Sequence, residues 1–464
     1  MTERQQHIFD VAVVGGGITG LTLAYLLQKA GLDVSLLEKR NEAGGVIRTH
    51  RSAGFLFDAG PNSTLVKSQR VLDLVEELGL KEALCYASDQ AENRYILKHG
   101  HLCKLPTSPP AFLKTNLLSA RAKLRVLGEL FVPRGPATST ETVADFVKRR
   151  LGPEFLDYVI NPFVAGIYAS DPSQLNLKAT FPRLLQLEQD YGGLIRGAIR
   201  KRFEKKNGQV AAMPKARMIS FASGMQALTA ALVACLGSAL QTGTTVTRVE
   251  QQGAGFLVRG QSATTGETVV AARRLILASP AYVTASLIEP LAPDAADLLA
   301  RVPYAPVAVV YYGFTRAAVG HPLDGFGFLV PEKEQRSILG TLWNSSLFPG
   351  RAPKGHAVLT TFVGGLRQPD LPQLPDGALH DRVRSELDAM LGLSEPPVVS
   401  HIHRWPKAIP QYTGRHHAVV EAVEQVEARY PGLHVTGNFR GGVSVADCIA
   451  NAYVLADDLL AHTT

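Results

Sequence analysis

The chain has 464 residues, of which 46% are hydrophobic and 19% are charged. This length is typical of about two to three domains, and the composition is that of a globular protein rather than a disordered chain. No run of apolar residues reaches the roughly 18 that a membrane span requires. The first ten residues, MTERQQHIFD, lack the apolar stretch of a signal peptide. We therefore expect a cytoplasmic protein, with attachment to a membrane surface left open.

The net charge of +7 comes from 48 basic and 41 acidic residues, and one stretch concentrates it, at 196–206 (RGAIRKRFEKK). A solvated helix face explains this run most simply, and attraction to an anionic membrane surface is the alternative. No recognition motif or aromatic platform accompanies the charge, so we expect no nucleic-acid partner.

The four cysteines are Cys85, Cys103, Cys235 and Cys448. They form no CxxC pair and have no metal-ligand spacing. We expect reduced, buried and inert thiols rather than a redox disulfide, and we expect no metal site.

A complete βαβ unit occupies about the first forty residues. A β-rich run at 9–14 predicts a buried strand, 21–27 predicts a helix that Gly31 ends, and 34–38 predicts a second strand. The intervening loop carries the candidate cofactor residues Gly15, Gly16, Gly17, Ile18, Thr19 and Gly20.

The spacing of the loop glycines predicts a dinucleotide site. Gly15 permits the tight turn, Gly17 lets the backbone approach a pyrophosphate, and Gly20 lets helix and strand pack closely. The helix N-terminus offers free N–H groups and the positive end of its dipole to the phosphates. Glu38 follows 18 positions after Gly20 and is expected to accept hydrogen bonds from the ribose hydroxyls.

A second glycine doublet, Gly44-Gly45, follows in the segment 39–49 (KRNEAGGVIRT). This segment resembles the extended FAD signature of amine-oxidase-like flavoproteins, with Lys39 and Val46 as further cofactor contacts. Lys39 and Arg40 would suit a 2′-phosphate, but the carboxylate of Glu38 opposes one. FAD is therefore the predicted cofactor.

The rest of the chain divides into two further parts. Residues 101–212 predict a mostly helical insertion, with a helix at 141–160 and a turn-rich apolar stretch at 161–172. Its amphipathic face is expected to cover the substrate cavity, with a membrane as the alternative. Residues 300–410 are strand-rich, with one helix near 378–391, which suits an antiparallel substrate-binding sheet.

We predict an α/β fold with a discontinuous Rossmann-like FAD-binding domain, an α+β substrate-binding domain and the helical insertion. The FAD-binding domain is assembled from 1–75, 213–281 and 420–464. The substrate-binding domain comprises 76–100 and 282–419.

Five motifs along the chain resemble those of the protoporphyrinogen oxidases. They are GNFRGGVSVADCI at 437–449, GFGFLVP at 325–331, LGTLWNSSLFPGR at 339–351, NPFVAGIYASDP at 161–172 and IPQY at 409–412. The motifs run in order across nearly the whole chain. The resemblance implies a porphyrinogen substrate, oxidised by six electrons through FAD with dioxygen as acceptor and hydrogen peroxide as by-product.

The resemblance also implies site residues. Arg94 matches the family's NRY/NRF arginine that pairs with a substrate carboxylate, and its guanidinium fork suits that task. Phe348, Phe328 and Leu329 are expected to line the tetrapyrrole slot, with ordinary core packing as the alternative for the phenylalanines. The backbone at Ala169 is implied to contact the macrocycle, although the family usually has glycine there.

Further FAD contacts are carried over by position, and they are Gly60, Pro61, Asn62, Ser63, Val246, Trp405, Asn438, Gly442, Val443 and Ser444. Plain packing is the alternative for Val246 and Trp405. No catalytic residue is assigned, because solvated or capping roles are typical of isolated histidines such as His401, His403, His416 and His417.

Three alternatives to protoporphyrinogen oxidation stay open. The first is a coproporphyrinogen III oxidase, whose substrate has four propionates and would require more cations. The second is an amine oxidase or carotenoid desaturase, and the third is a flavin-binding protein without turnover. The expected partners include a membrane surface, a ferrochelatase that receives the product, and a second copy in a homodimer if the chain is not monomeric.

Overall fold

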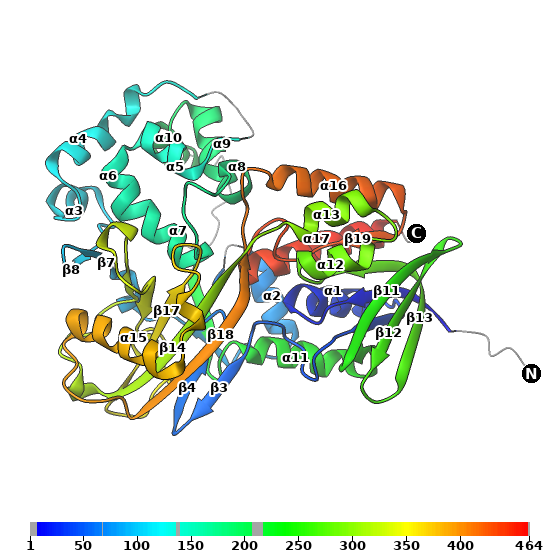
Figure 1. Ribbon diagram of the computed structural model, residues 1–464. Coiled ribbons are helices and arrows are strands. Elements are labelled where there is room, and N and C mark those ends of the chain that lie inside the picture. The colour runs from blue at the N-terminus through cyan, green and yellow to red at the C-terminus, as the bar shows by residue number, and fades with distance from the viewer. Residues whose placement is uncertain (1–6, 67, 136–139, 207–216, 463–464) are drawn as a thin grey trace, which may run out of the picture.

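The computed structural model describes residues 7–66, 68–135, 140–206 and 217–462 (Figure 1). Its first layer is a seven-stranded sheet in the order β10-β2-β1-β13-β12-β11, with β19 also paired to β13. The members are β1 (Ile8–Val14), β2 (Val34–Leu37), β10 (Leu240–Gln241), β11 (Thr244–Gln252), β12 (Gly255–Ser262), β13 (Gly266–Leu277) and β19 (Leu433–Val435). Strands from both ends of the chain and its middle therefore share one sheet.

We call this sheet the cofactor sheet. Helices cover both of its faces, which explains why every residue of β2 and of the end of β1 is buried. One core contains residues of α1 (Ile18–Lys29), α2 (Gln69–Glu77), α11 (Gln226–Leu236) and α17 (Val445–Ala461). The core on the other face contains residues of α12 (Ala281–Ile288), α13 (Pro293–Ala300) and α16 (His416–Arg429). The arrangement confirms the predicted α/β class.

A second seven-stranded sheet has the order β18-β14-β17-β16-β15-β7-β8. Its strands are β7 (Arg94–Lys98), β8 (His101–Lys104), β14 (Tyr304–Thr315), β15 (Gly327–Leu329), β16 (Gly340–Leu342), β17 (His356–Gly364) and β18 (Val399–Pro410). Helix α15 (Asp376–Leu391) covers one face, where Tyr312 and Leu359 lie. Val309 and Tyr311 lie on the opposite face, because side chains alternate along a strand.

Two small sheets connect these layers. A hairpin joins β3 (Thr49–Ser52) to β4 (Phe55–Asp58), and β9 (Arg217–Phe221) lies between β5 (Thr64–Val66) and β6 (Leu84–Tyr86). The short helix α14 (Asn344–Leu347) follows β16.

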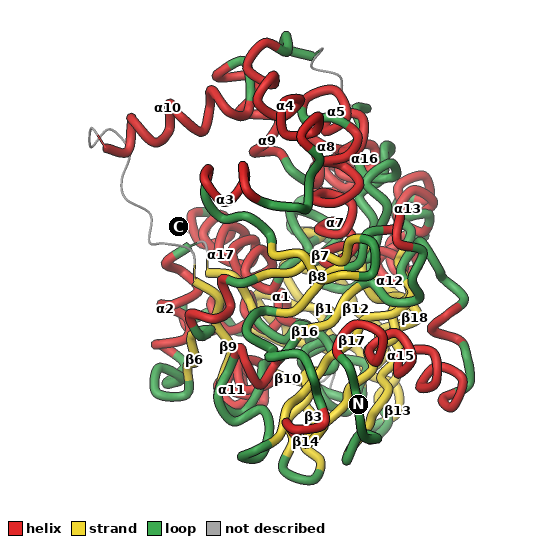
Figure 2. The backbone as a smooth tube through the Cα atoms, turned by 90° about the vertical axis from the view of Figure 1, so that its left-hand side faces the viewer, coloured by secondary structure: helices red, strands yellow, loops and turns green. Residues whose placement is uncertain are grey.

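The helical insertion forms a separate lobe beyond the second sheet (Figures 1 and 2). Its helices are α3 (Pro109–Lys114), α4 (Ala120–Leu127), α5 (Val143–Arg150), α6 (Pro153–Phe155), α7 (Asn161–Tyr168), α8 (Leu177–Thr180), α9 (Pro182–Tyr191) and α10 (Leu194–Lys206). No helix among the described residues is both long and apolar enough to cross a membrane.

The insertion differs from the prediction in two places. The turn-rich stretch expected at 161–172 is wrong, because α7 occupies most of it. Pro162 lies in the first turn of α7, where its missing N–H has no cost, and the helix ends where Ala169 adopts φ 49°. The helix expected at 141–160 is interrupted, because Gly152 adopts φ 94° after α5.

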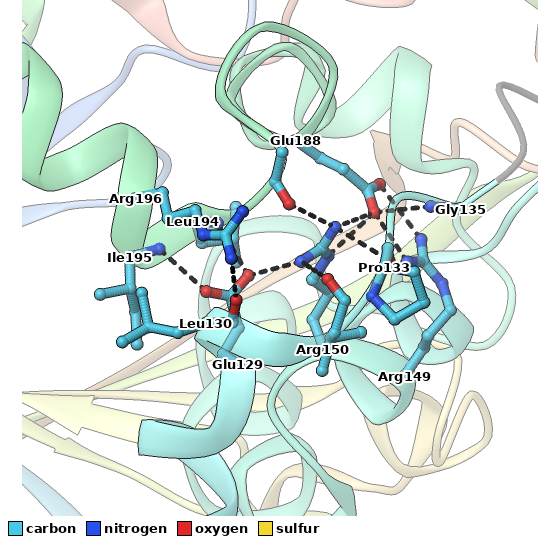
Figure 3. A network of polar contacts seen from close by, with 12 residues as sticks. Glu129, Leu130, Pro133, Gly135, Arg149, Arg150, Glu188, Leu194, Ile195 and Arg196 are labelled. Carbon is cyan, nitrogen blue, oxygen red and sulfur yellow. Dashed lines mark hydrogen bonds and ion pairs between the residues drawn. The ribbon is translucent and has the colours of Figure 1, made fainter.

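A buried charge network holds the insertion together (Figure 3). Arg150 is fully buried and donates to Glu129 at 2.8 Å and to Glu188 at 2.5 Å. Arg149 also donates to Glu188, at 2.7 Å. Glu129 in turn accepts hydrogen bonds from two N–H groups at the start of α10, those of Leu194 and Ile195. The network therefore joins α5, α9 and α10 through paired charges rather than through apolar packing alone.

Candidate cofactor and substrate site

The first glycine loop lies between the end of β1 and the start of α1. Gly15 adopts φ 111°, and a β-carbon there would lie 2.8 Å from the carbonyl oxygen of Ala278. A β-carbon at Gly20 would lie 2.0 Å from the carbonyl oxygen of Gly15. Both positions therefore require glycine for the fold itself, as the spacing predicted.

Gly17 differs from its neighbours because a β-carbon there would meet nothing within 4 Å. It is the N-cap of α1, and no side chain caps that helix end. The helix, from Ile18 through Thr19 onward, carries no acidic residue in its first turn. Free N–H groups, positive dipole and open space together fit a phosphate anion, so this loop fits the pyrophosphate of FAD.

Glu38 follows β2 beside the loop, with 9% of its surface exposed. One carboxylate oxygen accepts the N–H of Gly16 at 2.6 Å, and the other accepts the N–H of Arg40 at 2.8 Å. These two bonds fix the carboxylate and leave lone pairs free to accept hydrogen bonds from ribose hydroxyls. Lys39 is exposed at the surface.

The second glycine doublet packs directly on the first loop. The N–H of Gly44 donates to the carbonyl of Gly16 at 2.7 Å, and a β-carbon at Gly45 would lie 3.2 Å from the α-carbon of Gly17. The guanidinium of Arg40 donates to the carbonyl of Gly45 at 2.9 Å. Arg40 is thus engaged in holding this doublet, which weakens the case for a 2′-phosphate.

The loop at 60–63 joins the two glycine segments to the second sheet. A β-carbon at Gly60 would lie 2.1 Å from the carbonyl oxygen of Val46, whose own side chain is 40% exposed. The amide of Asn62 donates to Gly60 at 3.0 Å and accepts from Asn344 of α14 at 2.6 Å. Pro61 and Ser63 flank Asn62 in this loop and are both partly buried.

Trp405 and Val246, which the family resemblance implies as FAD contacts, lie at the margins of these loops. The indole of Trp405 on β18 donates to the carbonyl of Ala59 at 2.7 Å, so it contacts the backbone just before Gly60. Val246 lies on β11, which begins where Thr244 donates to the carbonyl of Glu38 at 2.9 Å. Val246 packs against the core on the α12 face of the cofactor sheet.

The C-terminal motif is held by Tyr412. Its hydroxyl donates to the carbonyl of Asn438 at 2.7 Å and accepts the N–H of Gly442 at 2.9 Å. Ser444 caps α17 by accepting the N–H of Asp447 at 3.1 Å, and Val443 packs against the core of the insertion.

The C-terminal motif and the first glycine loop meet at one place. A β-carbon at Gly437 would lie 3.3 Å from the carbonyl of Ser279, and the Gly15 loop contacts the preceding residue, Ala278. Parallel pairing of β1 and β19 with β13 produces this meeting. Most of the predicted FAD contacts are therefore brought together at one edge of the cofactor sheet, as ligands are in open α/β sheets.

The substrate residues follow the strand alternation of the second sheet. Arg94 pairs with Gly327, and Ile96 pairs with Leu329, so these four residues share one face. A β-carbon at Gly166 of α7 would lie 2.8 Å from Leu329, which places α7 against this face. We call this sheet face, together with the helix α7 that packs on it, the slot, after the tetrapyrrole slot expected from the sequence.

Arg94 is the first residue of β7 and lies on the slot face. Its side chain is exposed, and its guanidinium carbon lies 5.1 Å from the ring centre of Phe326. Desolvation by the surrounding protein lowers the pKa of Arg94, and no charged neighbour contributes to the shift. Among the described residues no carboxylate is within ion-pair distance of Arg94, so this cation is available to an incoming anion.

Phe328 and Phe348, which were both expected to line the slot, lie in different places. Phe328 is 2% exposed and packs in the core beneath α15, with its ring centre 6.4 Å from that of Trp343. Strand alternation places it on the face opposite Leu329. Phe348 is also 2% exposed and follows α14, with the Arg351 guanidinium 5.5 Å from its ring centre. Phe348 thus lies near the Asn62 loop.

Ala169 ends α7 in the left-handed region, at φ 49°, and is 3% exposed. Glycine adopts this conformation without steric cost, which accounts for the glycine usual in the family. The carbonyl of Ala169 accepts the N–H of Leu366 at 2.8 Å. Its remaining lone pair is the part of this carbonyl still able to accept a hydrogen bond.

A buried ion pair that the sequence analysis did not identify supports the Asn62 loop. Arg351 and Asp58 are each 1% exposed, with 3.5 Å between guanidinium and carboxylate. Burial raises the pKa of Asp58 and lowers that of Arg351, because desolvation outweighs their attraction. Arg351 also donates to Ser220 at 2.5 Å, and Ser220 donates to the carbonyl of Asn62 at 3.0 Å. The sequence feature that could have indicated this pair is Arg351, the arginine that ends the LFPGR motif.

The C-terminal histidines have structural roles. The ring of His416 stacks on Tyr412 at 4.1 Å, and burial lowers the pKa of His416 to about 4. His417 lies 3.2 Å from the carbonyl of Gly414, near the start of α16.

The comparisons agree with this geometry. The family model described as flavin containing amine oxidoreductase matches residues 18–460. A mitochondrial protoporphyrinogen oxidase of Nicotiana tabacum is 34% identical, over 97% of this chain and 95% of its own. A coproporphyrinogen III oxidase of Bacillus subtilis (strain 168) is 27% identical, over 100% of this chain and 99% of its own. A solved structure from Exiguobacterium sp. 255-15, provisionally assigned as a protoporphyrinogen oxidase, has a TM-score of 0.80 at 26% identity, covering 98% of this chain and 99% of its own.

Proposed function

Because this chain belongs to the flavin-containing amine oxidoreductase family, we propose that it oxidises protoporphyrinogen IX to protoporphyrin IX with dioxygen as the electron acceptor. The chain is an FAD-dependent oxidoreductase, and the plant relatives of similar length are protoporphyrinogen oxidases. Bound FAD supplies the capacity to take a hydride equivalent from carbon and to return the electrons to dioxygen, which no side chain can do. Removal of six electrons reduces three dioxygen molecules to three hydrogen peroxide molecules.

The residues of the chain divide the remaining tasks. The N–H groups after Gly17 bind the pyrophosphate, and Glu38 accepts hydrogen bonds from the ribose. The slot holds the macrocycle and limits access of water. Arg94 binds a propionate, since a guanidinium matches a carboxylate with two hydrogen bonds. The observation that carries the proposal is this exposed cation without a carboxylate partner among the described residues, at the edge of the slot.

Coproporphyrinogen III is the second candidate substrate, because the Bacillus subtilis relative matches over the whole chain. Its four propionates would require more cations than Arg94 supplies. Two neighbouring cations are already engaged: Lys98 lies 3.2 Å from Glu154, and Arg367 donates to the carbonyls of Val330 and Asn161. This engagement supports protoporphyrinogen as the preferred substrate.

The test uses both porphyrinogens, prepared anaerobically and mixed with the FAD-loaded chain. Porphyrin fluorescence is followed after oxygen is admitted, and peroxide is measured in the same samples. We expect fluorescence to rise faster with protoporphyrinogen IX, with three peroxide molecules for each porphyrin formed. A faster rise with coproporphyrinogen III would favour the second candidate, and no enzyme-dependent rise with either would refute the proposal.

The predicted domain division is part of the same proposal. The segments 1–75, 213–281 and 420–464 would form the FAD-binding domain, and 76–100 with 282–419 would form the substrate-binding domain. The core of the cofactor sheet also includes α12 and α13, which come from the second of these groups. The boundary between 212 and 213 lies outside the described residues.

We also propose that the insertion binds an anionic membrane surface. Several large apolar side chains at its surface are strongly exposed: Phe131 at 84%, Leu124 at 70%, Phe203 at 62% and Leu113 at 60%. Exposed cations lie on the helices that carry Leu113, Leu124 and Phe203, namely Lys114, Arg121, Arg200, Lys201 and Arg202. Apolar groups beside cations are the features by which amphipathic helices bind anionic bilayers.

Sedimentation with vesicles tests the membrane contact. We expect binding to phosphatidylglycerol vesicles that falls with added salt and falls again in the double variant Phe131→Ser, Phe203→Ser. Equal pelleting of the variant would contradict the proposed surface. Transfer of product to a ferrochelatase and the choice between monomer and homodimer stay predictions.

A further inference from the structure

Three histidines from distant parts of the sequence lie together between the β3–β4 hairpin and the edge strand of the second sheet. His50 is on β3, in the hairpin that precedes the Asn62 loop, and His401 and His403 are on β18, the edge strand of the second sheet. The ring centre of His50 is 5.3 Å from that of His401 and 5.9 Å from that of His403. His401 and His403 are two residues apart on one strand, so their rings lie on the same face of the sheet.

The ring nitrogens lie close to one another. One nitrogen from each histidine lies within 4.8 Å of one nitrogen from each of the other two. Nitrogens bound to a tetrahedral ion are separated by about 3.4 Å, given metal–nitrogen bonds of about 2.05 Å. A separation of up to 4.8 Å is wider than this, so binding of one ion requires the rings to draw together.

The surroundings of the His50 ring give a second observation that points to a bound ligand. Its Nε2 atom is inaccessible to solvent and has no hydrogen-bond partner among the described residues. A buried, unpaired ring nitrogen is costly, and either a bound ion or an ordered water would remove that cost. None of the three side chains is fully buried, so an ion can enter from solvent.

We propose that His50, His401 and His403 form a zinc site. Three imidazoles select a borderline ion of the Zn²⁺ class, and they exclude Mg²⁺ and Ca²⁺, which require oxygen ligands. A water molecule completes the tetrahedron. None of the three histidines is among the residues assigned to the slot or to FAD, although the ring centre of His403 lies 4.3 Å from that of Trp405.

The position of the site suggests its effect. A bound ion would connect the β3–β4 hairpin of the cofactor side to β18 of the substrate side. Trp405 is two residues beyond His403 on β18 and donates to Ala59, just before the loop at 60–63. Zinc would therefore hold the hairpin and the second sheet in a fixed relation beside the FAD loop, and it would stabilise the folded chain by binding only that state.

The experiment measures zinc binding by the FAD-loaded chain after removal of metals with a chelator. Zinc per chain is measured by elemental analysis after dialysis, affinity by competition with a chromophoric chelator, and thermal stability with and without zinc. The test variants are the double variant His401→Gln, His403→Gln and the single variant His50→Asn. The matched control is His101→Gln, His417→Gln, which removes two histidines elsewhere. Flavin absorbance verifies that each protein is folded.

We expect one zinc ion per chain for the original protein and for the control, with a higher melting temperature when zinc is present. The double variant should bind zinc at least about 100-fold more weakly and lose the zinc-dependent rise in melting temperature. If the double variant does not fold, the His50→Asn variant alone should show the weaker binding. Absence of stoichiometric zinc in the original protein, or equal binding by folded test variants and control, would overturn the proposal.

Discussion

Replacement of Arg94 by alanine removes a cation of the slot face for which the structure gives no carboxylate partner among the described residues. A charge-assisted hydrogen bond contributes about 1.5–3 kcal/mol. Because the Arg94 side chain is exposed, solvent screening favours the lower part of that range, about 1.5–2 kcal/mol. Such a loss corresponds to a rise in KM of about 10- to 30-fold. The change is expected in KM rather than in kcat, because the propionate lies away from the carbons that are oxidised.

The assay is steady-state oxidation of protoporphyrinogen IX, with KM and kcat determined separately and bound flavin measured by absorbance. Arg94→Lys should recover part of the loss, since it keeps the charge but not the fork. Arg259→Ala is the control, because Arg259 is a partly exposed strand arginine on β12 of the other sheet. Loss of flavin in Arg94→Ala, or a change in KM no larger than in the control, would refute the assignment of Arg94 to the substrate.

Two further predictions concern the cofactor loop and the insertion. Gly17→Ala should keep the fold, because the added carbon meets nothing in the protein, but it should lower FAD occupancy by filling the space for the pyrophosphate. Gly377→Ala is the control, because a β-carbon there is equally unhindered. Flavin absorbance should show that the control keeps its FAD. Glu188 is buried, which raises its pKa, but hydrogen bonds from Arg149, Gly135 and Arg150 lower the pKa to about 2 from 4.5. The stability that this lowered pKa contributes is present above pH ~4.5 and is lost as the pH falls toward ~2. Denaturant unfolding should therefore show a smaller acid-induced loss of stability in Glu188→Gln, and an identical loss would contradict the role of the network.

The cofactor side of the molecule was largely predictable from the sequence, because its signals are local. A strand, a glycine loop, a helix and a second strand follow within about forty residues, and each glycine has a steric reason that the structure makes explicit at Gly15 and Gly20. The α/β class, the helix near 378–391 and the paired glycine segments followed from the same patterns.

The residues missed by sequence analysis depend on contacts between distant segments. Asp58 and Arg351 are far apart in sequence, and only the fold buries them as a pair. The helix α7 was missed because its Asn-Pro start and small residues are typical of a turn, whereas packing of Val164 and Tyr168 in the insertion core stabilises a helix. Phe328 and Leu329 are neighbours in sequence, yet strand alternation separates them onto two faces.

The central claim is that this chain oxidises a porphyrinogen, with protoporphyrinogen IX preferred. The most direct measurement compares kcat/KM for anaerobically prepared protoporphyrinogen IX and coproporphyrinogen III in one assay, with the FAD-loaded chain and porphyrin fluorescence as the signal. The structure and its relatives predict a higher kcat/KM for protoporphyrinogen IX. An equal or higher value for coproporphyrinogen III would contradict the preference, and no turnover of either substrate by the FAD-loaded chain would contradict the function.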